Sequence, residues 1–272
     1  MPDLATLMPM IALLLLIGAF AGVIAGLLGV GGGIVLVPAF YYMFDHMGYG
    51  GPHLMQICVA TSLATIMATS MRSVMAHHRK GAVDWVILRL WGPWIVIGAI
   101  VGVFVAASLK SETLTAIFGT LAMIAGLYMA FGRDTWRVAP AMPAKPTRGI
   151  LATLIGFVSV LMGIGGGTFG VPMMTLYSMP IHRAIATASG FGMIIAVPSV
   201  IGFLFLPVEQ APPYTIGAVN IPAFLLVIGT TFLATPWGVR LAHAMNPKPL
   251  KRAFAVFLVL VALNMLRKVA GW

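Results

Sequence analysis

The chain has 272 residues, of which 60% are hydrophobic and only 8% charged, and its formal net charge is +10. Soluble domains carry about 25% charged residues, so this composition excludes an ordinary water-exposed surface. Long stretches contain no charged side chain, as between Arg89 and Lys110 or between Arg148 and Arg183. A helix needs about 20 apolar residues to cross a bilayer. The sequence therefore predicts an all-α polytopic membrane protein.

Ten hydrophobic elements follow one another along the chain. In the first half we place them at 7–28, 34–44, 54–77, 84–108 and 112–131. In the second half they fall at 149–162, 168–178, 182–206, 220–243 and 249–269. The second element of each half has about a dozen residues, too few to span about 30 Å of hydrocarbon at about 1.5 Å per residue. We expect about 8–10 membrane elements, with each short one forming a half-helix or re-entrant arm.

Three collinear matches show an internal repeat. The segment 29–38 resembles 163–172, since both begin Gly-x-Gly-Gly-Gly and end Val-Pro. Further matches pair 59–62 with 185–188 and 81–84 with 217–220. We divide the chain into an N-terminal transmembrane repeat at 1–131, a cytoplasmic linker at 132–148 and a C-terminal transmembrane repeat at 149–272.

The basic residues give an orientation and argue against nucleic acid as a partner. They lie in short clusters between apolar runs, as the positive-inside rule predicts, and form no basic aromatic face. The clusters expected in the cytoplasm comprise His77–Lys80; Arg133, Arg137, Lys145 and Arg148; and Arg240, His243, Lys248, Lys251 and Arg252. Both termini then lie outside. An odd number of elements per half makes the two halves inverted relative to each other.

The glycine clusters are candidate anion-binding segments. Within a membrane, irregular backbone survives only where protein buries it or where it lines a cavity. The half-helix after each cluster offers unpaired N–H groups and the positive end of its dipole. We select these positions as substrate-binding candidates: Gly31, Gly32, Gly33, Ile34, Gly165, Gly166, Gly167 and Thr168. The alternative is that these glycines only permit close helix packing.

Hydroxyl side chains in the third element of each half form a second group of candidates. They are Thr61, Ser62, Thr65, Thr69 and Ser70 in the first half and Thr187 and Ser189 in the second. Of these we select Thr61, Ser62, Thr65, Thr187 and Ser189 as substrate-binding candidates. A hydroxyl can donate a hydrogen bond to an anion without burying a countercharge. Each can instead bond to its own helix or to a neighbouring one. Thr61 and Thr187 rank first because the repeat duplicates them.

Charged groups near the apolar runs are candidates for an access path or for ion coupling. Arg72 and Arg89 lie inside such runs, and Asp84, five residues before Arg89, is its nearest acidic partner. Snorkelling towards the membrane surface is the alternative for both arginines. Arg183 begins an element and serves orientation first. We expect the six histidines to face surface loops.

The paired Gly-x-Gly-Gly-Gly segments, together with 182–187 and 77–85, resemble the TauE/SafE sulfite exporter family, also called the toluenesulfonate uptake permease family. The resemblance covers essentially the whole chain. It implies a multi-pass transporter of a bacterial-type plasma (inner) membrane for small sulfur-containing anions, such as sulfite, sulfoacetate or other organosulfonates. Ala188 stands where the first half has Ser62, so the hydroxyl site is not strictly symmetric.

These lines together predict a secondary transporter that binds a small anion near the membrane midplane. The chain has no Walker A motif; proton coupling, facilitated movement down a gradient, and oligomer formation all stay open. An anion channel or a carrier for small carboxylates is the alternative. A membrane-embedded enzyme would need a catalytic or metal-ligand motif. Finding none, we expect no enzyme activity, no metal and no cofactor.

Overall fold

The computed structural model describes residues 4–29, 31–132, 136–244 and 248–271. The first half forms α1 (Leu4–Leu28), α2 (Gly33–His46), α3 (Leu54–His78), α4 (Trp85–Ser108) and α5 (Ser111–Phe131). The second half forms α6 (Thr147–Leu161), α7 (Gly167–Leu176), α8 (Ile181–Leu204), α9 (Ile221–Ala244) and α10 (Lys248–Val269). A short antiparallel hairpin, β1 (Thr215–Ile216) and β2 (Val219–Asn220), precedes α9. Arg133, expected in the linker, lies outside the described residues.

The predicted all-α polytopic membrane class is confirmed. Six of the described helices, α1, α3, α4, α5, α8 and α9, are long and apolar enough to cross a bilayer. The helices that follow the two glycine clusters are short, with 14 residues in α2 and 10 in α7. At about 1.5 Å per residue neither spans a hydrocarbon core of about 30 Å. Each therefore ends or begins inside the protein, as predicted for half-helices.

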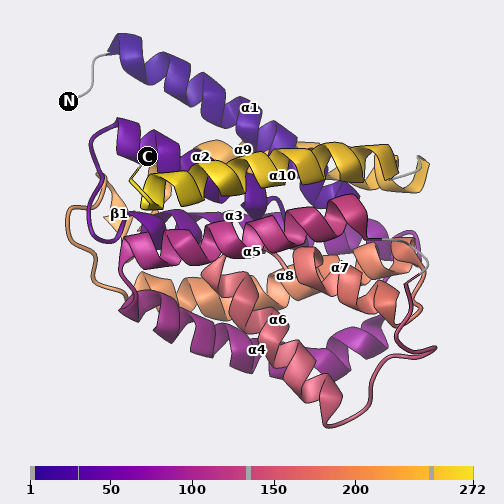
Figure 1. The fold of residues 1–272 in the computed structure, drawn as a ribbon. Helices are drawn as coiled ribbons and strands as arrows, with labels where there is room; N and C mark the ends of the chain where they lie inside the picture. Colours follow the sequence, from indigo (N-terminus) through magenta and orange to yellow (C-terminus); the bar gives the residue numbers. More distant parts are fainter. Residues whose placement is uncertain (1–3, 30, 133–135, 245–247, 272) are drawn as a thin grey trace.

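The helices pair in a pattern that is unchanged when the two halves are exchanged. The central helices α3 and α8 pack against each other, and so do α5 and α10. Helix α1 packs on α9, and its counterpart α6 packs on α4, the counterpart of α9. In Figure 1, α5 and α10 lie side by side and run in opposite directions, with the start of α1 and the end of α10 at the same end. An inverted repeat requires this arrangement; the inversion and the three boundaries stay predictions.

Glycines bring the backbones of these outer pairs together. A Cβ atom on Gly26 would collide with the Thr235 carbonyl oxygen of α9, and one on Gly98 with the Thr153 carbonyl oxygen of α6. Small residues allow such close approach in membrane helices, where apolar side chains gain little by leaving lipid. The α1–α9 and α4–α6 pairs thus pack on the outside of the central α3–α8 pair, and the glycine segments lie in the interior.

Candidate functional site

The two glycine segments meet in the interior of the protein. A Cβ atom on Gly31 would lie 3.2 Å from the Gly165 Cα, and one on Gly33 would collide with the Gly163 carbonyl oxygen. The described residues of the two segments, 29–33 and 163–167, are buried. Gly31 and Gly32 have φ angles of 78° and 77°, a region that favours glycine. The two backbone breaks are therefore in direct contact.

Each short helix begins at this contact. Helix α2 starts at Gly33 and α7 at Gly167. Among the described residues, the backbone N–H groups of Gly33, Ile34, Gly167 and Thr168 have no hydrogen-bond acceptor. Unpaired N–H groups at a helix start carry partial positive charge. Two such starts come together inside the protein and can bind an anion.

Each glycine segment also packs against the central helix of the opposite half. A Cβ on Gly29 would meet the Ile185 carbonyl oxygen of α8 at 2.5 Å, and one on Gly163 would meet the Val59 Cα of α3 at 2.9 Å. The Ser62 hydroxyl donates to the Gly163 carbonyl oxygen at 2.8 Å. Ser62 thus binds protein backbone at the glycine segment.

The two duplicated threonines have matching partners at opposite ends of the α3–α8 pair. The Asn220 backbone N–H donates to the Thr61 hydroxyl oxygen at 3.0 Å, and the Asp84 backbone N–H donates to the Thr187 hydroxyl oxygen at 3.0 Å. Asp84 and Asn220 are themselves equivalent in the repeat. Each threonine therefore anchors the start of a helix from the other half, so the structure does not bring Thr61 and Thr187 together.

Two more of the predicted hydroxyls bond within their own helices. Thr65 donates to the Thr61 carbonyl oxygen at 3.1 Å, and Ser189 donates to the Ala186 carbonyl oxygen at 2.7 Å. Such bonds satisfy a hydroxyl in an apolar surrounding. These two hydroxyls therefore bond to their own helices, which is the alternative to substrate binding that the sequence left open.

Other buried hydroxyls have no partner among the described residues. Ser70 in α3 is 1% exposed and Thr168 at the start of α7 is 4% exposed, and neither hydroxyl makes a hydrogen bond. A Cβ atom on Gly192 would collide with the Ser70 hydroxyl oxygen, and it would lie 3.7 Å from the Gly165 Cα. Ser70 therefore lies beside the second glycine segment.

Thr168 was selected as a substrate-binding candidate from the sequence, whereas Ser70 was named only among the hydroxyls of its element. Nothing in the sequence distinguishes Ser70 from those neighbours, because only the packing of α3 against α8 brings it next to Gly192.

Carboxylates are absent from the described residues around the two helix starts. Asp45 lies in the last turn of α2, Asp84 precedes α4, Glu112 is in the first turn of α5, and Glu209 is in the loop after α8. No described carboxylate therefore lies in the interior to neutralise the positive ends of α2 and α7.

The acidic partner predicted for Arg89 is wrong. The Asp84 carboxylate pairs with the Arg183 guanidinium at 2.9 Å and accepts from the backbone N–H groups of Val86 and Ile87. Side chains five residues apart do not lie on the same face of a helix, so Arg89 points away from Asp84. Helix α8 instead places Arg183 next to the Asp84 carboxylate. The Arg72 guanidinium instead lies 4.9 Å from the centre of the Phe232 ring of α9.

The expectation that all histidines face surface loops is also wrong for one of them. His77 is 1% exposed, and its Nδ1 lies 3.2 Å from Nε2 of His243, while its Nε2 lies 3.2 Å from the Gly26 carbonyl oxygen. The His182 ring stacks on that of His243, with centroids 5.9 Å apart. Helices α3, α8 and α9 thus bring three imidazoles together near the Asp84–Arg183 ion pair.

Comparisons with known proteins place this geometry in a family. The sulfite exporter TauE/SafE family matches residues 14–265. A probable membrane transporter protein of Haemophilus influenzae is 32% identical over 95% of this chain and 98% of its own length. A probable membrane transporter protein of Methanocaldococcus jannaschii is 25% identical over 94% of this chain and 96% of its own length.

No solved structure matches the chain significantly. The sequence match nevertheless spans both glycine segments and every helix of the described bundle, at least in part. The predicted resemblance is confirmed, and with it the prediction of a transporter and not an enzyme. The chain belongs to the sulfite exporter TauE/SafE family and is a multi-pass membrane transporter of a bacterial-type inner membrane.

Proposed function

We propose that this transporter carries small sulfur-containing oxyanions, such as sulfite, sulfoacetate or other organosulfonates, by secondary transport. The substrate binds between the first turns of α2 and α7. The observation that carries this proposal is the pair of helix starts that meet inside the protein, with N–H groups that have no acceptor among the described residues. Membership of the sulfite exporter family supports a sulfur oxyanion over other anions.

The chemistry of the site suits an SO₃ group. Three oxygens share the negative charge, so several weak donors around them bind better than one localised cation. The N–H groups of Gly33, Ile34, Gly167 and Thr168 supply such donors. The unpartnered hydroxyls of Thr168 and Ser70 can add two more. Because donors that lack a protein partner lose no existing hydrogen bond, they favour binding more than partnered ones.

The remaining candidates then support the site without binding substrate directly. Ser62 fixes the Gly163 carbonyl, and the two duplicated threonines fix the starts of α4 and α9. The contact between Gly31 and Gly165 closes the interior in this conformation. Transport requires these backbones to separate alternately towards each side, which is the behaviour of a carrier.

Solute counterflow in proteoliposomes tests the function directly. Sulfite and several organosulfonates are compared with chloride, sulfate and lactate. We expect saturable exchange confined to sulfite and sulfonates. Unsaturable anion leak would identify a channel instead, and preferred exchange of lactate would identify a carboxylate carrier.

Hydroxyl variants test the site. Ser70→Ala and Thr168→Val should raise KM for sulfite about tenfold, corresponding to about 1.4 kcal/mol per lost donor, with little change in stability. Ser199→Ala is the matched control, because Ser199 is equally buried but donates to the Ile195 carbonyl oxygen of its own helix. A KM unchanged in both site variants would contradict the proposed site while leaving the function open to the counterflow result.

A further inference from the structure

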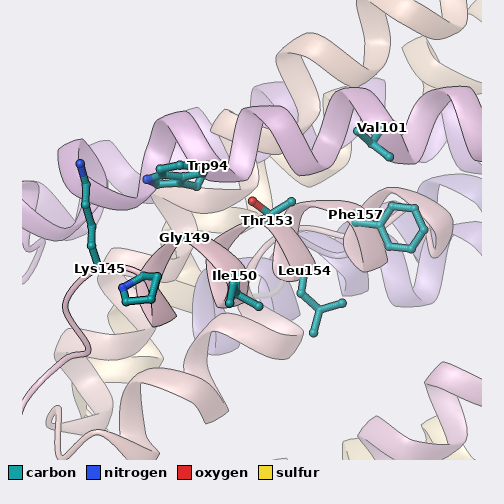
Figure 2. Close-up of a pocket in the computed structure, with 9 residues that line it drawn as sticks. Trp94, Val101, Lys145, Gly149, Ile150, Thr153, Leu154 and Phe157 are labelled. Atoms are coloured by element: carbon teal, nitrogen blue, oxygen red, sulfur yellow. The ribbon is translucent and has the colours of Figure 1, made fainter.

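An apolar groove lies on the outside of the bundle between α4 and α6. Its volume is about 750 Å³, and it is lined by Trp94, Val101, Lys145, Pro146, Gly149, Ile150, Thr153, Leu154 and Phe157. Figure 2 shows Trp94 and Val101 on α4 and Ile150, Leu154 and Phe157 along the neighbouring α6, with Lys145 at one end. The groove is separate from the glycine segments, so its function is independent of the proposed transport site.

The walls of the groove face the membrane. Ile150 is 67% exposed, Leu154 53% and Val101 47%, and such side chains contact lipid in a membrane-spanning bundle. From Gly149 to Phe157 helix α6 rises eight residues, or about 12 Å at about 1.5 Å per residue. That length is close to one leaflet of a hydrocarbon core of about 30 Å.

One end of the groove carries positive charge that no described residue neutralises. Lys145 lines this end, and Arg148 directly precedes the lining residue Gly149 in the chain. Neither forms an ion pair in the described part of the chain, and the Arg148 Nε is buried without a partner there. The positive-inside rule places this end, in the linker before α6, at the cytoplasmic leaflet. Basic side chains between membrane helices on that side recognise anionic lipid headgroups.

The equivalent position in the first half lacks these features. Counting back 134 positions, the offset of the glycine segments, takes Thr147 at the start of α6 to Leu13 and Lys145 to Ile11. Helix α1 already begins at Leu4, so its helix continues through the place where the second half has a basic linker. Trp94 corresponds to Thr230 at the offset of 136 that relates Gly81 to Gly217. The duplicated fold therefore has this basic, tryptophan-lined groove end in one half.

We propose that the groove between α4 and α6 is a binding site for one anionic phospholipid of the cytoplasmic leaflet. Lys145 and Arg148 hold the phosphate of the headgroup. The Trp94 ring, which packs 3.4 Å from the position of a Cβ on Gly149, forms the floor beneath the glycerol region. An acyl chain lies along Ile150, Leu154 and Phe157.

Native mass spectrometry of the full-length protein in detergent tests this site. The probes are phosphatidylglycerol and phosphatidylcholine with identical acyl chains. We expect phosphatidylglycerol to bind at least tenfold more tightly. The double variant Lys145→Gln/Arg148→Gln should lose about fivefold for each cation removed. Val101→Trp, which fills the groove without changing its charge, should also weaken binding.

The matched control removes two other cations. Arg79→Gln/Arg89→Gln deletes the same charge from exposed positions at the same end of the bundle but outside the groove, and should change binding less than twofold. Equal losses in the two double variants would show nonspecific surface charge and overturn the proposal. So would equal affinity for the two lipids, or displacement of the lipid by about 10 mM inorganic phosphate. Thermal unfolding of each variant confirms that the protein remains folded.

Discussion

The two ends of the α3–α8 pair have the same hydrogen bond but different charge. At one end Thr61 accepts from the Asn220 N–H, and at the other Thr187 accepts from the Asp84 N–H, both at 3.0 Å. The Asn220 amide remains neutral, while the Asp84 carboxylate pairs with Arg183. The hydrogen bond between threonine and backbone N–H is therefore the same at both ends, whether the residue that donates it is charged Asp84 or neutral Asn220.

Three imidazoles cluster at one end of this pair. His77, His182 and His243 lie at the end that holds Arg183. In the repeat, His182 corresponds to Gln56, whose amide donates to the Ala106 and Leu109 carbonyl oxygens at the other end. A scaffold with two equivalent ends thus has an imidazole cluster at one end and a buried amide at the equivalent position of the other.

The largest loss of stability should come from a substitution in the glycine segments, which lie between the two ends of the α3–α8 pair. Gly32→Ala adds a Cβ 2.8 Å from the Ala21 carbonyl oxygen at a φ of 77°. We expect a loss of about 3 kcal/mol in the free energy of unfolding, or failure to fold, because both strain and overpacking oppose the methyl group. Denaturant unfolding in detergent measures it.

Gly48→Ala is the control for Gly32→Ala, because Gly48 also has a positive φ, 84°, but no atom lies within 4 Å of its added Cβ. It should lose only about 1 kcal/mol from the backbone conformation. Equal losses in the two variants would mean that close packing at the glycine segment contributes nothing.

Removing the hydroxyl at either end should be the next largest effect. Thr61→Val and Thr187→Val each leave a backbone N–H at a helix start without its acceptor, which should lower stability by about 1–2 kcal/mol. Similar losses would show that the two ends are energetically equivalent. Thr61→Ser and Thr187→Ser keep the hydroxyl and should recover most of the loss; a failure to recover would assign the effect to packing.

Replacing Asn220 by aspartate and Asp84 by asparagine tests how much each end depends on its own polar side chain. Asn220→Asp replaces an amide that donates to the Pro213 carbonyl oxygen by a carboxylate, at a position only 3% exposed. We expect a loss of about 1–3 kcal/mol, since a buried donor is removed and an acceptor faces an acceptor.

Asp84→Asn should cost less than about 1 kcal/mol. It loses the ion pair to Arg183, whose side chain is 56% exposed, and asparagine is an equally good N-cap for α4. Thermal unfolding of both variants measures the difference. If Asp84→Asn proved the more damaging variant, the ion pair would be the main support of its end.

Acidification should loosen the histidine cluster, with the smallest effect. The bond between His77 and His243 needs one donor and one acceptor nitrogen. Protonating both rings would remove it, beside the further positive groups Lys80, His182 and Arg183, with Asp84 as the nearby acid. Histidines of the unfolded chain take up protons below about pH 6.5, whereas the bonded pair must keep its acceptor nitrogen unprotonated. The unfolded chain therefore binds more protons, and stability falls as pH falls.

We expect a loss of about 1 kcal/mol between pH 7.5 and 5.5. His243→Phe should reduce the pH dependence, while Gln56→Leu at the other end should leave it intact. A pH dependence unchanged in His243→Phe would place the titrating group elsewhere.

Much of the fold was predictable from local features of the sequence. Uncharged runs, the short elements after Gly33 and Gly167, and the duplicated motifs are all readable without a structure, because helix length and lipid solubility depend on neighbouring residues. The polar partners were less predictable. The partner chosen for Asp84 was wrong, and Ser70 could not be distinguished from the other hydroxyls of its helix, because these contacts join residues about a hundred positions apart.

The sequence by itself determined that this is a helical membrane protein with two similar halves and two glycine breaks. Composition and repeats record these properties directly, and they do not depend on how the helices are packed. Only the tertiary structure decided which hydroxyls are already bonded, such as that of Thr187, and which have no partner among the described residues, such as that of Ser70. A hydrogen bond requires two atoms to lie within about 3 Å, and that distance is set by the angle and register of packed helices.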